Sequence, residues 1–151
     1  MSPRGGAGAG RAPAEVVRSL LADSEGDLGE VRVVRESLRQ WDRGCFRAQQ
    51  AAEKSLRALR VWLAQDAGVP LAYIEEHIQA IGEREPRVAA LLSEGRRLDR
   101  YFLRTGLPLG VPQIHSEDDC RVAHDAAVRM TQAAIDALEA LGFTRPPLDR
   151  L

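Results

Sequence analysis

Apolar positions recur three or four residues apart along most of this chain, which is the spacing of one face of an α-helix. The pattern runs over about residues 14–40 and again over about residues 45–65. A shorter stretch covers residues 71–81, and two more follow Pro86 and Ser116. No segment alternates apolar and polar residues as a half-buried strand does. The pattern therefore predicts an all-α fold.

Turn-forming residues separate these segments. Gly68 and Pro70 divide the second helix from the third, and Pro86 fits the first turn of the fourth. A connection rich in Gly and Pro covers residues 106–114, after which Ser116 can cap the amides of the last helix. Short connections between long amphipathic helices are typical of an up-and-down antiparallel bundle, so we expect about five helices packed in this way.

The positions that should face the core form two seams, one on the second helix and one on the last. Both seams must leave water, because burial of apolar surface drives folding. The first pattern predicts one long helix, and Gly26, which weakens it by about 1 kcal/mol, marks the place where a kink or break would occur. The seam residues expected to be buried are Ala52, Leu56, Leu59, Ala127, Met130 and Ala134.

Composition adds the domain organisation. We expect a flexible leader over residues 1–13, the helical bundle over residues 14–142 and a tail over residues 143–151. A net charge of -1 argues against a uniformly basic nucleic-acid binder, although a local arginine-rich face remains open. No apolar run approaches the ~20 residues needed to span a bilayer, so a cytoplasmic protein is expected.

The two cysteines have no paired-ligand spacing. Cys45 and Cys120 lie far apart in the sequence, and both fall on apolar helical faces. We expect two reduced thiols that pack as small hydrophobic groups, and neither a metal nor a cofactor.

Two motifs carry a family resemblance. The segment 45–59 contains Gln-Gln-Ala-Ala-Glu-Lys followed by an apolar ladder, and Leu-Asp-Arg-Tyr-Phe follows later at residues 98–102. They resemble the HEPN family, small helical domains encoded beside nucleotidyltransferases, some of which are ribonucleases. The resemblance covers roughly residues 15–141. It implies the same helical bundle and a homodimer whose shared cleft lies at the last helices and the loop before them.

The resemblance also points to candidate site residues. In ribonuclease members an Arg holds the scissile phosphate, and a His acts as general acid or base at the start of a late helix. The branch that this chain resembles has Thr-Arg-Tyr-Pro where residues 105–108 read Thr-Gly-Leu-Pro. The catalytic candidates are therefore a displaced pair, Arg104 and His115, whose convergence needs a folded-back loop. Three acids at residues 117–119 oppose a phosphate there.

A second set of candidates concerns binding. Arg100 and Arg104 can bind phosphate, and Tyr101 can stack on a base. The alternative is that Tyr101 packs against the end of the bundle. His77 and His124 are interpreted as structural or surface histidines.

Three functions are compatible with these observations. The first is a homodimeric accessory protein that binds a nucleotide or RNA and works with a separately encoded nucleotidyltransferase. The second is a metal-independent ribonuclease, such as the toxin of a toxin-antitoxin pair, which uses Arg104 and His115. The third is a helical scaffold without catalysis.

Overall fold

The computed structural model describes residues 12–64, 73–102 and 114–145, and every regular element in these ranges is helical. This confirms the all-α class that the hydrophobic pattern predicts. In chain order the helices are α1 (Pro13–Val33), α2 (Trp41–Trp62), α3 (Ile74–Ile81), α4 (Pro86–Ala89), α5 (Leu92–Asp99) and α6 (Glu117–Ala140).

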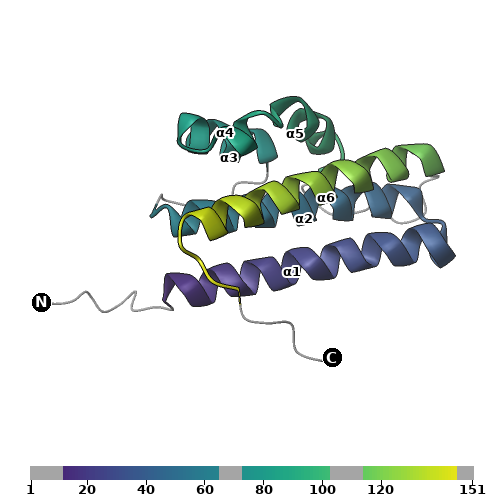
Figure 1. Ribbon diagram of the computed structural model, residues 1–151. Coiled ribbons are helices and arrows are strands. Elements are labelled where there is room, and N and C mark those ends of the chain that lie inside the picture. Colours follow the sequence, from purple (N-terminus) through teal and green to yellow (C-terminus); the bar gives the residue numbers. More distant parts are fainter. Residues whose placement is uncertain (1–11, 65–72, 103–113, 146–151) are drawn as a thin grey trace, which may run out of the picture.

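Helix α2 is the centre of the bundle. Helices α1 and α6 both pack along it, whereas they touch each other little. Figure 1 shows that α1 runs in one direction and α2 in the opposite one, that α3, α4 and α5 together return above them, and that α6 again follows the direction of α2. The third leg of this up-and-down bundle is therefore a chain of short helices rather than one long helix.

The first helix is one long helix, as the pattern predicts, and it is not broken near Gly26. α1 runs without interruption through Gly26, because Val17, Leu21 and Val31 on either side are buried against the bundle and their packing outweighs the weak propensity of glycine. The irregularity comes later, at a π-helical segment, Val34–Leu38.

The fourth predicted helix is divided in two. Pro86 does start a helix, as expected, but α4 ends after one turn and α5 begins at Leu92. The division lets α4 bury Val88 against α6 while α5 lies close to α3. Gly95 makes the second approach possible, since a side-chain carbon there would lie 2.8 Å from Ile74 Cγ2.

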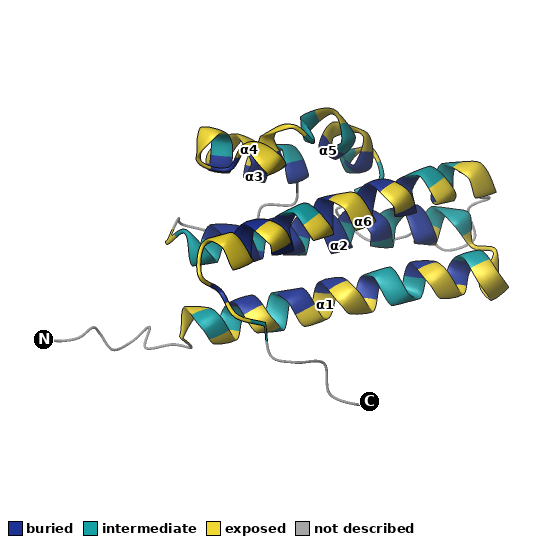
Figure 2. Cartoon of the chain, viewed as in Figure 1, coloured by how far each residue is buried: buried dark blue, intermediate teal, exposed yellow. Residues whose placement is uncertain are grey.

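The core follows the two predicted seams. Ala52, Leu56 and Leu59 of α2 are 0% exposed, and so are Ala127, Met130 and Ala134 of α6, which confirms both seams. Figure 2 shows buried positions along the faces that the long helices turn toward one another.

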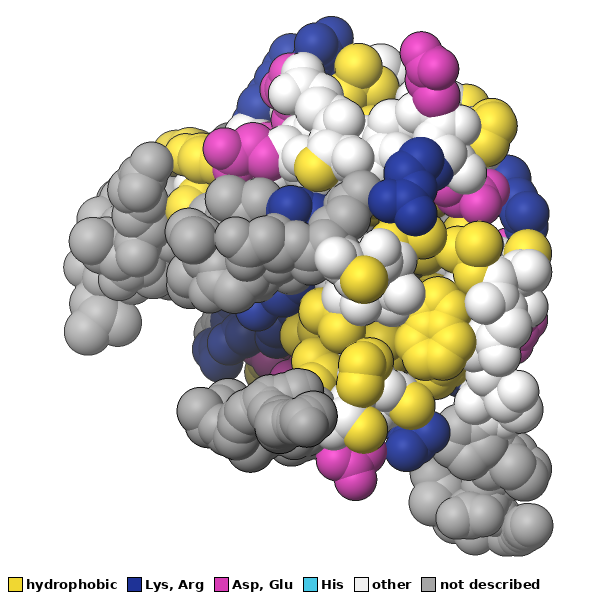
Figure 3. All heavy atoms as spheres, turned by 90° about the vertical axis from the view of Figure 1, so that its left-hand side faces the viewer, with side chains coloured by type: hydrophobic (Ala, Val, Ile, Leu, Met, Phe, Trp, Pro, Cys, Tyr) yellow, Lys and Arg dark blue, Asp and Glu magenta, His cyan; other side chains and the backbone are white. Residues whose placement is uncertain are grey.

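The end of the bundle where α2 and α6 finish carries hydrophobic side chains at its surface. Figure 3, which views this end, shows them gathered in the middle of the face. Trp62 closes α2 here: its Nε1–H donates to the carbonyl of Leu141 at 3.0 Å, and its ring meets the edge of Phe143 at 5.3 Å between centroids. These contacts fix the carboxyl end of α6 on α2.

Candidate functional site

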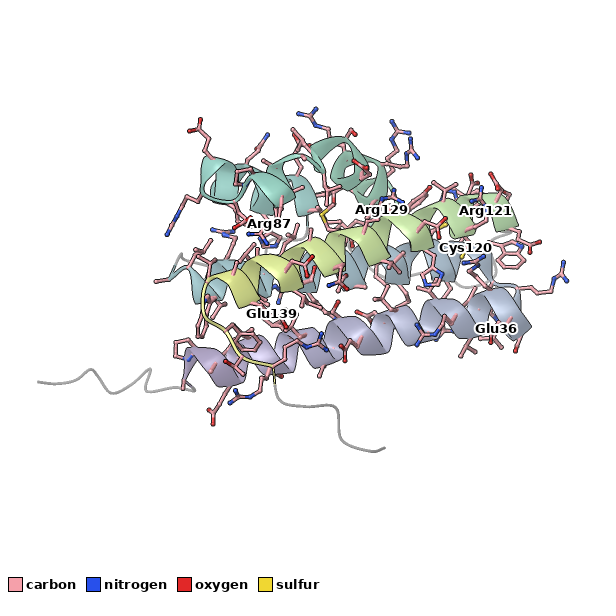
Figure 4. The ribbon with its side chains drawn as sticks, viewed as in Figure 1. Glu36, Arg87, Cys120, Arg121, Arg129 and Glu139 are labelled. Carbon is pink, nitrogen blue, oxygen red and sulfur yellow. The ribbon has the colours of Figure 1, made fainter. Side chains whose placement is uncertain are left out.

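The predicted site residues lie near the opposite end, where α6 begins. Ser116 starts this helix with the expected capping box: its Oγ accepts from Asp119 N at 3.0 Å, and its own N–H donates to Asp119 Oδ2 at 2.9 Å. Figure 4 shows Cys120 and Arg121 at this end of α6, above Glu36 of the π-helical segment that follows α1. This segment, the start of α2 and the start of α6 therefore lie at the same end of the bundle.

His115 precedes the cap and contacts two groups. Its ring meets the ring of Tyr101 edge-on, with centroids 4.8 Å apart and planes at 89°. Its Nδ1 lies 3.8 Å from Asp119 Oδ2, an ion pair that exists only when the imidazole is protonated. The side chain is 25% exposed, so solvent reaches the ring.

The backbone before α6 is held by Asp42 from the first turn of α2. The N–H of His115 donates to Asp42 Oδ1 at 2.8 Å, and the N–H of Ile114 donates to its Oδ2 at 3.1 Å. Sequence reasoning missed this role, because Asp42 and His115 are 73 positions apart in the sequence. We call Asp42, Tyr101, His115 and Asp119 the His115 corner.

Tyr101 enters this corner from the end of α5. Burial raises the pKa of its phenol above the usual 10, and the negative charge of Asp119 raises it further against the opposing effect of Arg97 and Arg100. Tyr101 is therefore un-ionised at neutral pH and can donate a hydrogen bond. Its ring also packs against the hydrophobic core, as the alternative for Tyr101 expects, and stacking on a base stays a prediction.

Arg100, the second predicted binding residue, is exposed just after α5, as is Arg97 one turn earlier. Neither forms an ion pair within the described part of the chain. Beside them lies a groove of about 480 Å³ lined by Tyr73, Glu75, Glu76, Gln79, Arg96, Asp99 and Arg100. Arg96 is paired there with Glu75 at 3.1 Å, so among the groove's arginines only Arg100 has no ion pair within the described residues.

Asp99 shows why the Leu-Asp-Arg-Tyr motif is mainly a fold signature. Its carboxylate accepts the N–H groups of Ile74 and Glu75 at 2.7 and 2.9 Å, and it also accepts from Nε2 of Gln49 at 3.1 Å. It therefore caps α3 and ties α2 and α5 to it. Burial raises the pKa of Asp99 despite these hydrogen bonds.

The thiols lie under the corner. Cys45 and Cys120 are both 0% exposed and form no disulfide, as the sequence predicts for two reduced, packed cysteines. Their mutual hydrogen bond and then burial raise the pKa of Cys45, so it is no thiolate at neutral pH. Gly44 permits this packing, because a side-chain carbon there would lie 2.5 Å from Cys120 Sγ.

Of the two displaced catalytic candidates, the structure describes only His115, which lies in the corner. Arg104 lies outside the described residues, so its convergence with His115 stays a prediction. No group of three His, Cys, Asp or Glu side chains that would suit a metal ion occurs in the described ranges. None of the helices described is long and apolar enough to cross a membrane.

The fold and these motifs define a small helical-bundle protein. A model of the HEPN domain matches residues 17–138, so the chain belongs to the HEPN domain family. Among solved structures, the crystal structure of TT1696 from Thermus thermophilus is similar with a TM-score of 0.69, over 81% of this chain and 98% of that one. The two share 22% sequence identity, so this likeness supports the fold alone. No curated protein matches the chain significantly.

Proposed function

We propose that this HEPN protein binds single-stranded RNA at the His115 corner without cutting it, as an accessory to a separately encoded nucleotidyltransferase. The observation that carries the proposal is the pair of solvent-accessible rings, Tyr101 and His115, beside the unpaired Arg97 and Arg100. Aromatic rings next to arginines suit single-stranded nucleic acid, since bases stack on the rings and phosphates pair with guanidinium groups.

Binding without cleavage follows from the surroundings of His115. A general base needs a free ring nitrogen and a cation that holds the phosphate nearby. Asp119 contacts only the Nδ1 side of the ring, so the obstacle is the missing cation: Glu117, Asp118 and Asp119 place three acids in the same turn, which opposes a phosphate there. At the position where the resembling branch carries its Arg and Tyr, this chain has Gly106 and Leu107.

Arg100→Gln is expected to weaken binding of a fluorescein-labelled single-stranded RNA and to lower the salt dependence of that affinity. Removing one phosphate contact should reduce the slope of log K against log salt by about 0.7 for a single strand. Tyr101→Ala should cost about 1–3 kcal/mol of binding through lost stacking. Fluorescence anisotropy at several salt concentrations measures both effects.

The control is Arg87→Gln, which removes an exposed arginine of α4 that pairs with Glu85 at 2.8 Å, at the opposite end of the bundle (Figure 4). Its affinity and salt slope should equal those of the unmodified protein. An equal loss in the Arg87 and Arg100 variants would mean that binding depends only on total charge, and the corner would not be the site.

A ribonuclease is the second candidate, because the His115–Asp119 contact resembles the way a carboxylate orients a catalytic histidine. The same RNA, incubated with the protein and resolved on a denaturing gel, separates the two functions. We expect intact RNA. Robust cleavage that disappears in the Arg104→Ala, His115→Ala double variant would replace the binding role with catalysis, as in a toxin of a toxin-antitoxin pair.

A homodimer is part of the proposal. Ile114 is 79% exposed directly beside the corner, and α6 leaves Val128 45% exposed. A second copy that covers this region would bring two corners together in one cleft. Sedimentation velocity at micromolar concentration should therefore show a dimer that Ile114→Asp weakens; a monomer throughout the concentration range would remove the shared cleft.

A further inference from the structure

The groove between α3 and α5 lies next to the His115 corner. Its volume of about 480 Å³ falls in the range of small-molecule sites, about 300–1,000 Å³. Arg100 lines the groove, and Tyr101, the next residue along the chain, lies in the corner. A nucleic-acid strand bound at the corner can therefore continue into the groove along the same surface.

Hydrogen bonds hold the two walls of the groove together. Asp99 of α5 accepts the N–H groups of the first two residues of α3 at 2.7 and 2.9 Å. Glu75 Oε2 accepts from Arg96 Nε at 3.1 Å and from Gln79 Nε2 at 3.1 Å. Asp99 and Glu75 are thus occupied by contacts within the protein, and these contacts position the two walls relative to each other.

The remaining charged groups of the groove are available to a ligand. Glu76 is exposed on α3, and its carboxylate has no ion pair or hydrogen bond within the described ranges. Arg100 is exposed as well and unpaired in the same ranges. Arg96 engages its Nε, so the N–H groups of its two Nη atoms remain as donors. The α3 wall therefore presents an acceptor, whereas the α5 wall presents donors.

Guanine matches an acceptor on one wall and donors on the other. Its N1–H and N2–H groups are neighbouring donors that a single carboxylate accepts together, while its O6 and N7 are neighbouring acceptors for the fork of an arginine. Adenine places only one donor group, N6, beside its acceptors N1 and N7, so a carboxylate meets an acceptor as well. Uracil and cytosine have no N7.

Tyr73 adds an aromatic side chain to the groove. The residue directly precedes α3 and is half-buried, and its ring meets the ring of Phe102 edge-on, with centroids 5.3 Å apart. This contact holds the tyrosine ring in place. Bases stack on such rings whatever their hydrogen-bonding edge, so Tyr73 favours a base in the groove and the charged groups select which base.

We propose that the groove is a guanine subsite of the RNA site at the His115 corner. Glu76 accepts the N1–H and N2–H groups of the base, Arg96 donates to its O6 and N7, and Arg100 pairs with the phosphate of the strand. This inference rests on the RNA-binding role proposed above and adds a base preference to it.

The test uses the full chain and fluorescence anisotropy with three labelled oligouridine strands. Each strand carries one guanosine, one adenosine or one inosine at the same central position. We expect the guanosine strand to bind about tenfold tighter than the adenosine strand, which is the discrimination given by one good bidentate contact. Inosine lacks the 2-amino group of guanosine, so its strand should bind with an affinity between the other two.

Glu76→Gln should abolish the preference for guanosine over adenosine. A glutamine offers one acceptor and one donor, a pair that suits adenine rather than guanine. Glu83→Gln is the matched control, since it removes an exposed glutamate of the short segment Gly82–Arg84 outside the groove, and it should keep the tenfold ratio. The ratio of the two affinities cancels the general gain in RNA binding that follows from removing one negative charge.

The possible failures are distinguishable. Equal affinities for the three strands in the unmodified protein would overturn the guanine subsite and leave RNA binding at the corner in place. A guanosine preference that survives in the Glu76 variant would place the reading of the base elsewhere and overturn the subsite as well. Absence of binding to every strand would reject the RNA-binding role itself, and the subsite with it.

Discussion

Leu59→Asp is expected to abolish folding. Leu59 is 0% exposed on the face of α2 that the other helices cover. The substitution removes a buried leucine, which costs about 2–5 kcal/mol, and places a carboxylate where burial of an unpaired charge costs several kcal/mol more. A domain with a typical stability of about 5–15 kcal/mol loses most or all of its folded population. Far-ultraviolet circular dichroism should show little helix.

Leu38→Asp is the matched control for this change. It makes the same chemical substitution at a leucine that is 47% exposed at the end of the π-helical segment. Surface substitutions of this kind change stability by about 0.5 kcal/mol or less. A control as unfolded as the Leu59 variant would mean that the added charge, and not its burial, disrupts the protein.

The sequence predicts the helices well where periodicity and local chemistry agree. Both seams, the Pro86 start and the Ser116 capping box are confirmed, because each depends on residues that are neighbours in sequence or on one helix face. The prediction fails between α4 and α5, where one continuous helix is expected. There tertiary packing decides the backbone, which a local pattern does not report.

The site is predicted less completely for the same reason. Tyr101 and His115 were both singled out, and the structure brings their rings together across an intervening connection. Asp42 and the Arg35–His124 contact were missed, since each joins residues more than 70 positions apart. No spacing rule within one element reports such a contact.

The helical pattern also does not predict the buried hydrogen-bond network around Glu53. Glu53 lies on α2 with 1% of its side chain exposed, and it accepts from Arg57 Nη2 at 2.6 Å and from His77 Nε2 at 2.7 Å. Arg60 Nη1 lies 3.3 Å from His77 Nδ1, which makes Nδ1 the acceptor and Nε2 the donor toward Glu53. The network ties the short α3 to the central helix, and the groove beside Arg100 depends on that position.

Glu53→Ala should therefore destabilise the protein by about 3–5 kcal/mol in urea unfolding, since it leaves the buried donor of His77 and the guanidinium group of Arg57 without their anion. Glu53→Gln keeps an acceptor for His77 and should cost less. Glu139→Ala, at an exposed glutamate in the last turn of α6, is the control and should change stability by about 0.5 kcal/mol or less.

Acid titration provides the decisive comparison for Glu53. Burial raises the pKa of this carboxyl, but hydrogen bonds from His77 and Arg57 outweigh burial and lower it below 4.5. A lowered folded pKa means that the unfolded chain binds the proton more readily, so the stabilisation is complete above pH 4.5 and is lost as the pH falls through the folded value. The Gln variant lacks this titration. Its stability should fall less steeply than that of the unmodified protein below pH 4.5, and parallel acid profiles would show that Glu53 does not hold α3 through its charge.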